Sequence, residues 1–188
     1  VYPMWDDEAN TYLCSSPARY RGMRRFAAVD YGTVNPCVFL DVRDDGHTFW
    51  IAGEYYWDSS RTQRQKTDAE YAEDLAAFLG GDRNVQVIVD PSAASFKAEL
   101  RNRGFRVQDA RNDVREGIAT TAVLIGRRQV MVEKSRCPCL LAEMHSYLWD
   151  EKARRRGEER PLKEKDHAMD ALRYLCHTRT DRFRRGEP

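Results

Sequence analysis

The sequence predicts an α/β fold in which a mixed central sheet carries helices on both faces. Three apolar segments come first, and two of them are joined at DDG, residues 44–46, which is a strong hairpin signal. Segments with strand and helix periodicity then alternate to the end of the chain. An early hairpin is typical of an antiparallel sheet edge, and the later alternation is typical of parallel pairing.

The first half of the chain is expected to be irregular and then strand-rich. Residues 1–22 contain prolines and a glycine and read as a linker, or as the tail of a preceding domain, with residues 23–180 as the folded domain. The apolar run FAAV predicts a strand over 24–32, and a hairpin is expected over 36–57. A helix is expected over 67–81, since a Thr-Asp pair can cap its start and two glycines can end it.

In the second half, helices and strands are expected to alternate up to two successive helices at the end of the chain. NVQVIVD predicts a strand over 84–93, and the next segment, 93–104, is an amphipathic helix that ends in glycine. The remaining expected elements are a strand over 105–110, a helix over 112–126, a strand or extended arm over 127–133, a helix over 137–153, a polar loop over 154–165 and a last helix from Glu164 to His177. Residues 181–188 are expected to form a flexible tail.

The composition is that of a globular protein from a reducing compartment. The 188 residues are 41% hydrophobic and 32% charged, with a formal net charge of +1, so net charge alone does not indicate a nucleic-acid binder. The five cysteines are odd in number and irregularly spaced, which argues against a disulfide framework. No apolar run approaches 18 residues, so no membrane span is expected.

Two of the expected strands deliver an aspartate where a turn begins. Asp30 follows FAAV, and Asp90 follows VQVIV. In α/β sheets, sites are usually built at the carboxyl ends of the strands. Each aspartate taken alone could equally cap a turn or the next helix, so the interpretation depends on what the rest of the chain supplies.

The last helix supplies an acidic cluster in KEKDHAMDALRY, residues 163–174. Asp166 and Asp170 share a helix face, and His167 is a neighbour of Asp170 on the helix surface. Asp166 could favour the helix dipole in the first turn. Asp170 sits mid-helix among core-forming residues, where an unpaired carboxylate would be costly, so a nearby arginine or a metal ion is expected beside it.

Asp30, Asp90 and Asp170 are therefore expected to converge at one edge of the sheet. Such hard oxygen ligands suit Mg²⁺ or Mn²⁺, and two ions could clamp the attacking and leaving oxygens of a phosphodiester during in-line attack by water. His167 could bind the second metal, orient an acid or take part in proton transfer. Asp166 is a further candidate ligand.

Four motifs are specific in combination: VDYG (29–32), VDPSAASFKAEL (89–100), NDVREGI (112–118) and KEKDHAMDALRY (163–174). Together they resemble the nuclease domain of the large terminase subunit of tailed bacteriophages, over about residues 24–178. The resemblance implies a ribonuclease H-like fold and a divalent-metal-dependent endonuclease that cuts concatemeric double-stranded viral DNA during genome packaging. It implies Asp30, Asp90 and Asp170 as the acids of the site, with His167 beside them and Asp166 ranked last.

The resemblance also implies what accompanies the domain. A full large terminase carries an ATPase motor, but no phosphate-binding loop G-x-x-x-x-G-K-[ST] occurs here, so the chain is expected to be the C-terminal nuclease domain. The implied partners are double-stranded DNA, the motor domain, the portal protein and the small terminase subunit, in the cytoplasm of the infected bacterial host. The implied cofactor is Mg²⁺ or Mn²⁺, as two ions.

Binding of DNA is expected to depend mainly on phosphate contacts and to weaken steeply with salt. The candidate contacts are Lys97, Arg101, Arg103, Arg127, Arg128 and the loop 154–160.

Two other functions remain open. The domain could be a non-catalytic module that docks DNA or the portal, or, because VDYGT (29–33) resembles the first phosphate loop of actin-like ATPases, an ATP-dependent phosphotransferase. The latter needs a second glycine-rich loop, for which Gly80–Gly81 is the one double glycine in the sequence.

Overall fold

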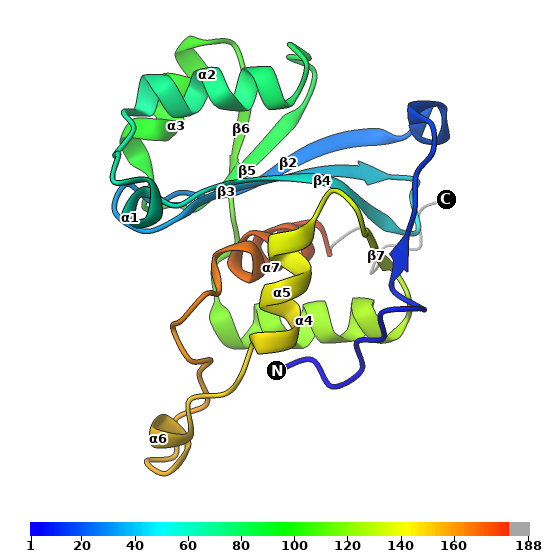
Figure 1. Cartoon of the computed structure of the whole chain (residues 1–188), viewed down its shortest axis with the longest axis vertical. Helices are drawn as coiled ribbons and strands as arrows, with labels where there is room; N and C mark the ends of the chain where they lie inside the picture. The colour runs from blue at the N-terminus through cyan, green and yellow to red at the C-terminus, as the bar shows by residue number, and fades with distance from the viewer. Residues whose placement is uncertain (181–188) are drawn as a thin grey trace.

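The computed structural model describes residues 1–180 and is built on a seven-stranded mixed sheet (Figure 1). The strands, in the order β1-β7-β4-β3-β2-β5-β6, are β1 (Thr11–Tyr12), β7 (Val130–Glu133), β4 (Phe49–Trp57), β3 (Cys37–Asp44), β2 (Arg24–Asp30), β5 (Gln86–Val89) and β6 (Arg106–Asp109). β3 runs antiparallel to β2 and β4, and the other pairs are parallel. The predicted mixed α/β fold is confirmed, whereas the expected tail 181–188 lies outside the described residues.

Helices cover both faces of this sheet, as predicted (Figure 1). The helices are α1 (Ser59–Thr62), α2 (Asp68–Phe78), α3 (Ala94–Asn102), α4 (Val114–Gly126), α5 (Pro138–Ser146), α6 (Glu151–Arg154) and α7 (His167–Arg179), with a 3-10 turn, η1, over Pro17–Tyr20. α2 and α3 pack on one face and α4, α5 and α7 on the other. Successive side chains of one strand point to opposite faces of the sheet and so enter different cores. On β3, Phe39 packs in the core beneath α2 and α3, whereas Leu40 packs in the core beneath α4, α5 and α7.

The predicted hairpin lies in the middle of the sheet, so the expectation of an antiparallel edge was wrong. β3 and β4 pair on either side of the DDG turn. β7 then returns to pair with β4, and β1 pairs with β7. These two short strands lie outside the hairpin, and β1 belongs to the segment 1–22 that was expected to be irregular.

Residues 1–22 pack against the domain. Tyr2 and Tyr20 are buried, and the side-chain amide of Asn10 donates to the carbonyl oxygens of Ile125 (3.1 Å) and Val130 (3.3 Å). These bonds join the segment to the end of α4 and the start of β7. Its role as a linker to another domain stays a prediction.

The helix boundaries differ from expectation near the end of the chain. The expected helix 137–153 stops at Ser146, because Tyr147 is extended. The last helix starts at His167, not Glu164, because Lys165 has a left-handed φ of +51° and the chain enters the helix only after it. In contrast, α2 begins on the predicted cap, where Thr67 and Glu70 form a capping box.

An arm, residues 147–165, joins α5 to α7 and projects from the body of the domain (Figure 1). Its two sides are held by a bridge between Trp149 and Pro161 and by the bond from the Leu162 amide to the Leu148 carbonyl (2.9 Å). α6 lies at its tip, and the predicted polar loop is its second half. None of the helices within residues 1–180 has the length and apolar character needed to cross a membrane.

Candidate active site

The sheet places two aspartates side by side. β2 and β5 are neighbouring parallel strands in which Val29 is paired with Val89. Asp30 and Asp90 are the next residues, so both carboxylates stand at the carboxyl ends of adjacent strands. This is the edge of an α/β sheet at which sites are usually built.

The first turn of α7 faces Asp30 across a small acidic pocket. Nδ1 of His167 lies 2.9 Å from Oδ2 of Asp30. The pocket, of about 340 Å³, is lined by Asp30, Tyr31, Gly32, Asn35, Lys163, Asp166, His167 and Asp170. The structure thus brings four of the five residues named from the sequence to one concave surface.

Asp90 is not among the residues that line this pocket, but α7 holds it too. Oδ2 of Asp90 accepts a hydrogen bond from the hydroxyl of Tyr174 (2.7 Å), and Oδ1 accepts one from the Ser92 amide (2.7 Å). Burial acts to raise the pKa of Asp90, but these bonds outweigh it and the pKa is lowered. Sequence reasoning missed Tyr174, although it lies one helical turn after Asp170 on the same face.

Asp170 is buried and is paired with two cations. Oδ1 accepts from the guanidinium of Arg173 (2.9 Å), and Oδ2 lies 2.9 Å from the ammonium of Lys163. Arg173, only 2% exposed, also donates to the carbonyl oxygen of Asn112 (3.0 Å). The arginine expected beside Asp170 is therefore present, and the NDV motif contributes the backbone oxygen that holds it.

Asp166 occupies the N-cap position of α7 without capping it. The helix is capped from another element: Glu143 of α5 accepts from the amides of Ala168 (2.7 Å) and Met169 (3.2 Å). Tyr56 of β4 donates to the other carboxylate oxygen of Glu143 (2.8 Å). The Asp166 carboxylate is thereby left to face the pocket, 3.1 Å from the ammonium of Lys163.

Two cations of the chain counter the negative charge of the pocket. Burial alone would lower the pKa of His167, but the hydrogen bond and the negative charge of Asp30 raise it above its ordinary 6.5. Burial likewise acts to lower the pKa of Lys163, but the carboxylates of Asp170 and Asp166 raise it. Both groups are more readily protonated than in water.

The donor chemistry of the pocket suits a divalent cation. Asp30, Asp166 and Asp170 offer the hard oxygen ligands that Mg²⁺ and Mn²⁺ prefer. The ion pair with Lys163, at 3.1 Å, is the polar contact that the described residues give to the buried Oδ2 of Asp166. As the side chains stand, residues 1–180 contain no group of three or more His, Cys, Asp or Glu side chains arranged to hold an ion.

None of the five side chains expected to contact DNA lines the pocket, and Lys97 lies beside Pro91, the residue after Asp90. Lys97 is buried, and its ammonium is bound to Asp109 (2.7 Å) and to the carbonyl oxygen of Pro91 (2.8 Å). Arg101 and Arg103 lie in the last turn and at the C-cap of α3, at the opposite end of this helix from Asp90.

Arg127 and Arg128 follow α4 at the opposite end of the sheet. The next residue, Gln129, accepts from the amide of Phe49 at the start of β4. The pocket is level with Tyr56, the β4 residue two strands from Asp30. The seven residue steps from Phe49 to Tyr56 span about 23 Å, so this pair cannot contact a phosphate in the pocket.

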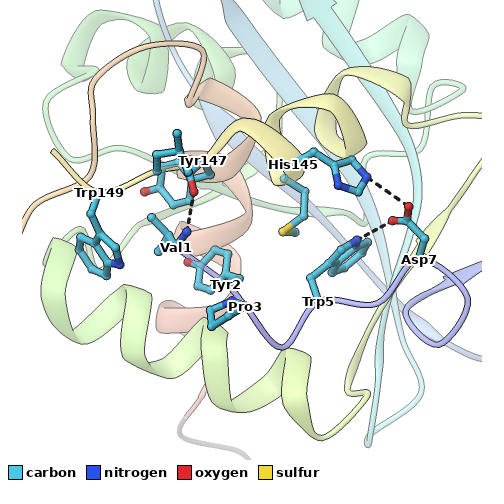
Figure 2. Close-up of a pocket in the computed structure, with 10 residues that line it drawn as sticks. Val1, Tyr2, Pro3, Trp5, Asp7, His145, Tyr147 and Trp149 are labelled. Carbon is cyan, nitrogen blue, oxygen red and sulfur yellow. Dashed lines mark hydrogen bonds and ion pairs between the residues drawn. The ribbon is translucent and has the colours of Figure 1, made fainter. Parts of the chain in front are cut away.

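A larger cavity, of about 540 Å³, lies between the N-terminal segment and the end of α5 (Figure 2). Its lining includes the aromatic side chains of Tyr2, Trp5, Tyr147 and Trp149. The carboxylate of Asp7 is bound to the indole of Trp5 (2.7 Å) and to His145 (3.2 Å) (Figure 2). Asp7 is the one described acidic residue that lines this larger cavity, whereas three aspartates line the smaller pocket. The smaller pocket is therefore the better candidate for an active site.

The phosphotransferase alternative is contradicted by the position of the double glycine. Gly80 and Gly81 follow α2, next to Leu79, whose carbonyl oxygen accepts from Arg25 (2.8 Å). Arg25 lies at the start of β2, whereas Asp30 lies at its end. The two glycine motifs are therefore at opposite ends of the sheet and cannot bind one nucleotide.

Comparison with known proteins shows the family to which the chain belongs. The chain is similar to the large terminase of the thermophilic bacteriophage D6E, at 37% identity and a TM-score of 0.88, over 95% of this chain and 44% of that one. It therefore spans less than half the length of that relative. No curated protein sequence matches the chain.

Two isolated nuclease domains share the fold at lower identity. The P22 large terminase nuclease domain matches at 17% identity and a TM-score of 0.70, over 96% of this chain and 90% of that one. The large terminase nuclease of thermophilic phage G20c, with bound magnesium, matches at 16% and 0.66, over 85% and 82%. The family described as "Terminase RNaseH-like domain" matches residues 28–179, most of the chain. The chain accordingly belongs to the family of ribonuclease H-like nuclease domains found in phage large terminases.

Proposed function

We propose that this domain is a divalent-metal-dependent endonuclease that cuts concatemeric double-stranded viral DNA during genome packaging. The observation that carries the proposal is the meeting of Asp30, at the end of β2, with Asp166, His167 and Asp170 of the α7 region in one pocket. Asp90 stands on the neighbouring strand. The G20c nuclease has been crystallised with bound magnesium and also with cobalt, which supports the choice of a divalent metal.

The proposed roles are metal binding for the four aspartates and proton transfer for the histidine. Asp30, Asp166 and Asp170 would hold the ions from the pocket, and Asp90 would do so from the adjoining strand. Bound divalent ions, two in the proposed mechanism, would supply Lewis-acid chemistry that activates water and neutralises charge at the phosphate. His167 orients the Asp30 carboxylate through Nδ1 and can accept or release a proton there.

The remainder of the packaging machinery is proposed from the same relationship. The domain would act beside an ATPase motor, on double-stranded DNA, together with the portal protein and the small terminase subunit in the cytoplasm of the infected host. The relative from D6E is more than twice as long as this chain, which leaves room for such a motor in a complete protein.

The test is conversion of supercoiled plasmid to nicked and linear forms in Mn²⁺, Mg²⁺, Ca²⁺ or EDTA. Wild type is compared with Asp30→Asn, Asp90→Asn, Asp166→Asn and Asp170→Asn, with folding checked by thermal melts. We expect cutting in Mn²⁺ or Mg²⁺ that EDTA abolishes and that each folded variant loses by at least about a hundredfold. Variants that cut as well as wild type would disprove the assignment of the acids.

A non-catalytic docking module is the second candidate. One observation favours it: the described side chains form no group of three or more ligands arranged to hold a metal ion. Instead, Lys163 is paired with Asp166 and Asp170, and His167 is paired with Asp30. A wild-type domain that binds DNA but leaves plasmid intact with every metal would support this alternative.

A further inference from the structure

Lys163 lines the pocket with an ammonium whose positive charge opposes a metal ion. Its ammonium lies 2.9 Å from Oδ2 of Asp170 and 3.1 Å from Oδ2 of Asp166. These are carboxylates that would have to turn toward a divalent cation. An ammonium at these distances offsets their mutual repulsion and fills the space between them.

The lysine belongs to the arm and not to the core of the domain. Its side chain is 60% exposed, whereas those of Asp166 and Asp170 are 5% and 10% exposed. The ammonium can therefore move into solvent by rotation of its own flexible stem, without opening the core. The two carboxylates stay in the pocket, because both aspartates are buried and Arg173 also holds Asp170.

We propose that Lys163 is a tethered cation that competes with divalent metal for Asp166 and Asp170 and so keeps the site metal-free until it is displaced. The proposal rests on the proposed function, since it assumes that these acids bind the metal. It accounts for a pocket with suitable donors that nevertheless presents no assembled metal-binding group.

Isothermal titration of the domain with Mn²⁺ tests the competition without measuring cleavage. We expect Lys163→Gln to bind Mn²⁺ about tenfold more tightly than wild type, because a positive charge within about 3 Å of the ligands is removed. Lys165→Gln is the matched control: this exposed neighbour loses the same charge on the same arm, and its affinity should stay within about twofold. Lys163→Arg keeps the cation and should bind no more tightly than wild type.

Thermal melts supply a second measurement. Without metal, Lys163→Gln should melt below wild type, since Asp166 and Asp170 then lack their shared cation. Saturating Mn²⁺ should raise its melting temperature by more than that of wild type or Lys165→Gln.

The outcomes separate this inference from the proposed function. If wild type binds Mn²⁺, Asp30→Asn weakens binding and Lys163→Gln binds no more tightly, the competition is disproved while the metal site stands. If neither wild type nor Lys163→Gln binds Mn²⁺, or if the aspartate variants bind it unchanged, both fail.

Discussion

Among single residues, Gly117 has the clearest link to the site. It lies on α4, directly against the buried side chain of Arg173, the partner of Asp170. A Cβ atom at Gly117 would stand 2.7 Å from Cγ of Arg173 and 3.0 Å from Cδ. Arg173 cannot retreat easily, because it is fixed to Asp170 and to the carbonyl oxygen of Asn112. The glycine of the NDVREGI motif therefore leaves the space that the side chain of Arg173 occupies, and a larger residue would displace that side chain.

We predict that Gly117→Ala destabilises the domain although it improves helix propensity. The propensity gain is about 1 kcal/mol, whereas overpacking a buried site costs about 1–3 kcal/mol and here also displaces a paired arginine. The net change in the free energy of unfolding should be a loss of about 1–2 kcal/mol, measured by urea denaturation.

Gly126→Ala, at the end of the same helix, is the matched control. A Cβ there meets Cγ of Met4 at an ordinary 3.6 Å, so this variant should be neutral or slightly more stable. Equal effects of the two substitutions would contradict the steric argument.

At the scale of elements, two helices next to the site begin on glutamates supplied by other elements. Glu54 of β4 accepts from the amides of Cys139 (2.6 Å) and Leu140 (2.8 Å) at the start of α5. Glu143 of α5 does the same for α7. A cap that lies within a few residues of the helix start, such as Thr67, can be predicted from the sequence. A cap supplied by a residue that is distant in the sequence cannot.

The turn after β7 gives a pH-dependent prediction. The buried carboxylate of Glu133 accepts from the amides of Cys14 (3.1 Å) and Arg136 (2.7 Å) and from the hydroxyl of Ser135 (2.8 Å). Burial acts to raise the pKa of Glu133, but these bonds outweigh it and lower the pKa below its ordinary 4.5. A depressed pKa stabilises the fold above pH 4.5, and that stabilisation is lost as the pH falls through the folded-state value.

Glu133→Gln should therefore cost about 1–3 kcal/mol at pH 7, and the difference from wild type should shrink below pH 4.5. Urea denaturation between pH 7 and pH 3 measures it. The exposed Glu8→Gln should match wild type throughout. A Glu133→Gln deficit that is constant over this range would show that charge on Glu133 contributes nothing.

At the scale of the whole molecule, local patterns predicted the elements but not their long-range neighbours. Strand and helix periodicity was sufficient for β2 to β5 and for α2, α3 and α4, and the acids at strand ends pointed to the correct sheet edge. The two-residue strand β1 has too few residues for a pattern, and its pairing with β7 is decided by tertiary packing. The ion pairs of Lys163 with Asp166 and Asp170 could not be predicted either, because an exposed lysine in a polar loop has no sequence signature.

The same limitation applies to the basic side chains. Arginine tracts are visible in the sequence, but which of them lie near the pocket depends on the fold. Arg127 and Arg128 are at the opposite end of the sheet. The arm, by contrast, ends at the pocket through Lys163, and residues 151–165 carry seven basic and four acidic side chains. The arm is therefore a candidate surface for contact with a duplex that has a phosphate in the pocket.

We therefore predict that the arm and not the end of α4 contributes to the salt dependence of DNA binding. Each lost phosphate contact reduces the slope of log K against log salt by about 0.9. Replacing Arg154 and Arg155 together by glutamine should reduce the magnitude of the slope by up to about 2, measured on a short duplex in Ca²⁺ between 50 and 200 mM salt. The matched double variant, Arg127→Gln with Arg128→Gln, removes the same charge and should leave the slope unchanged. The reverse pattern would show that the duplex contacts the far end of the sheet, about 23 Å from the acids, and not the arm, which would contradict this prediction.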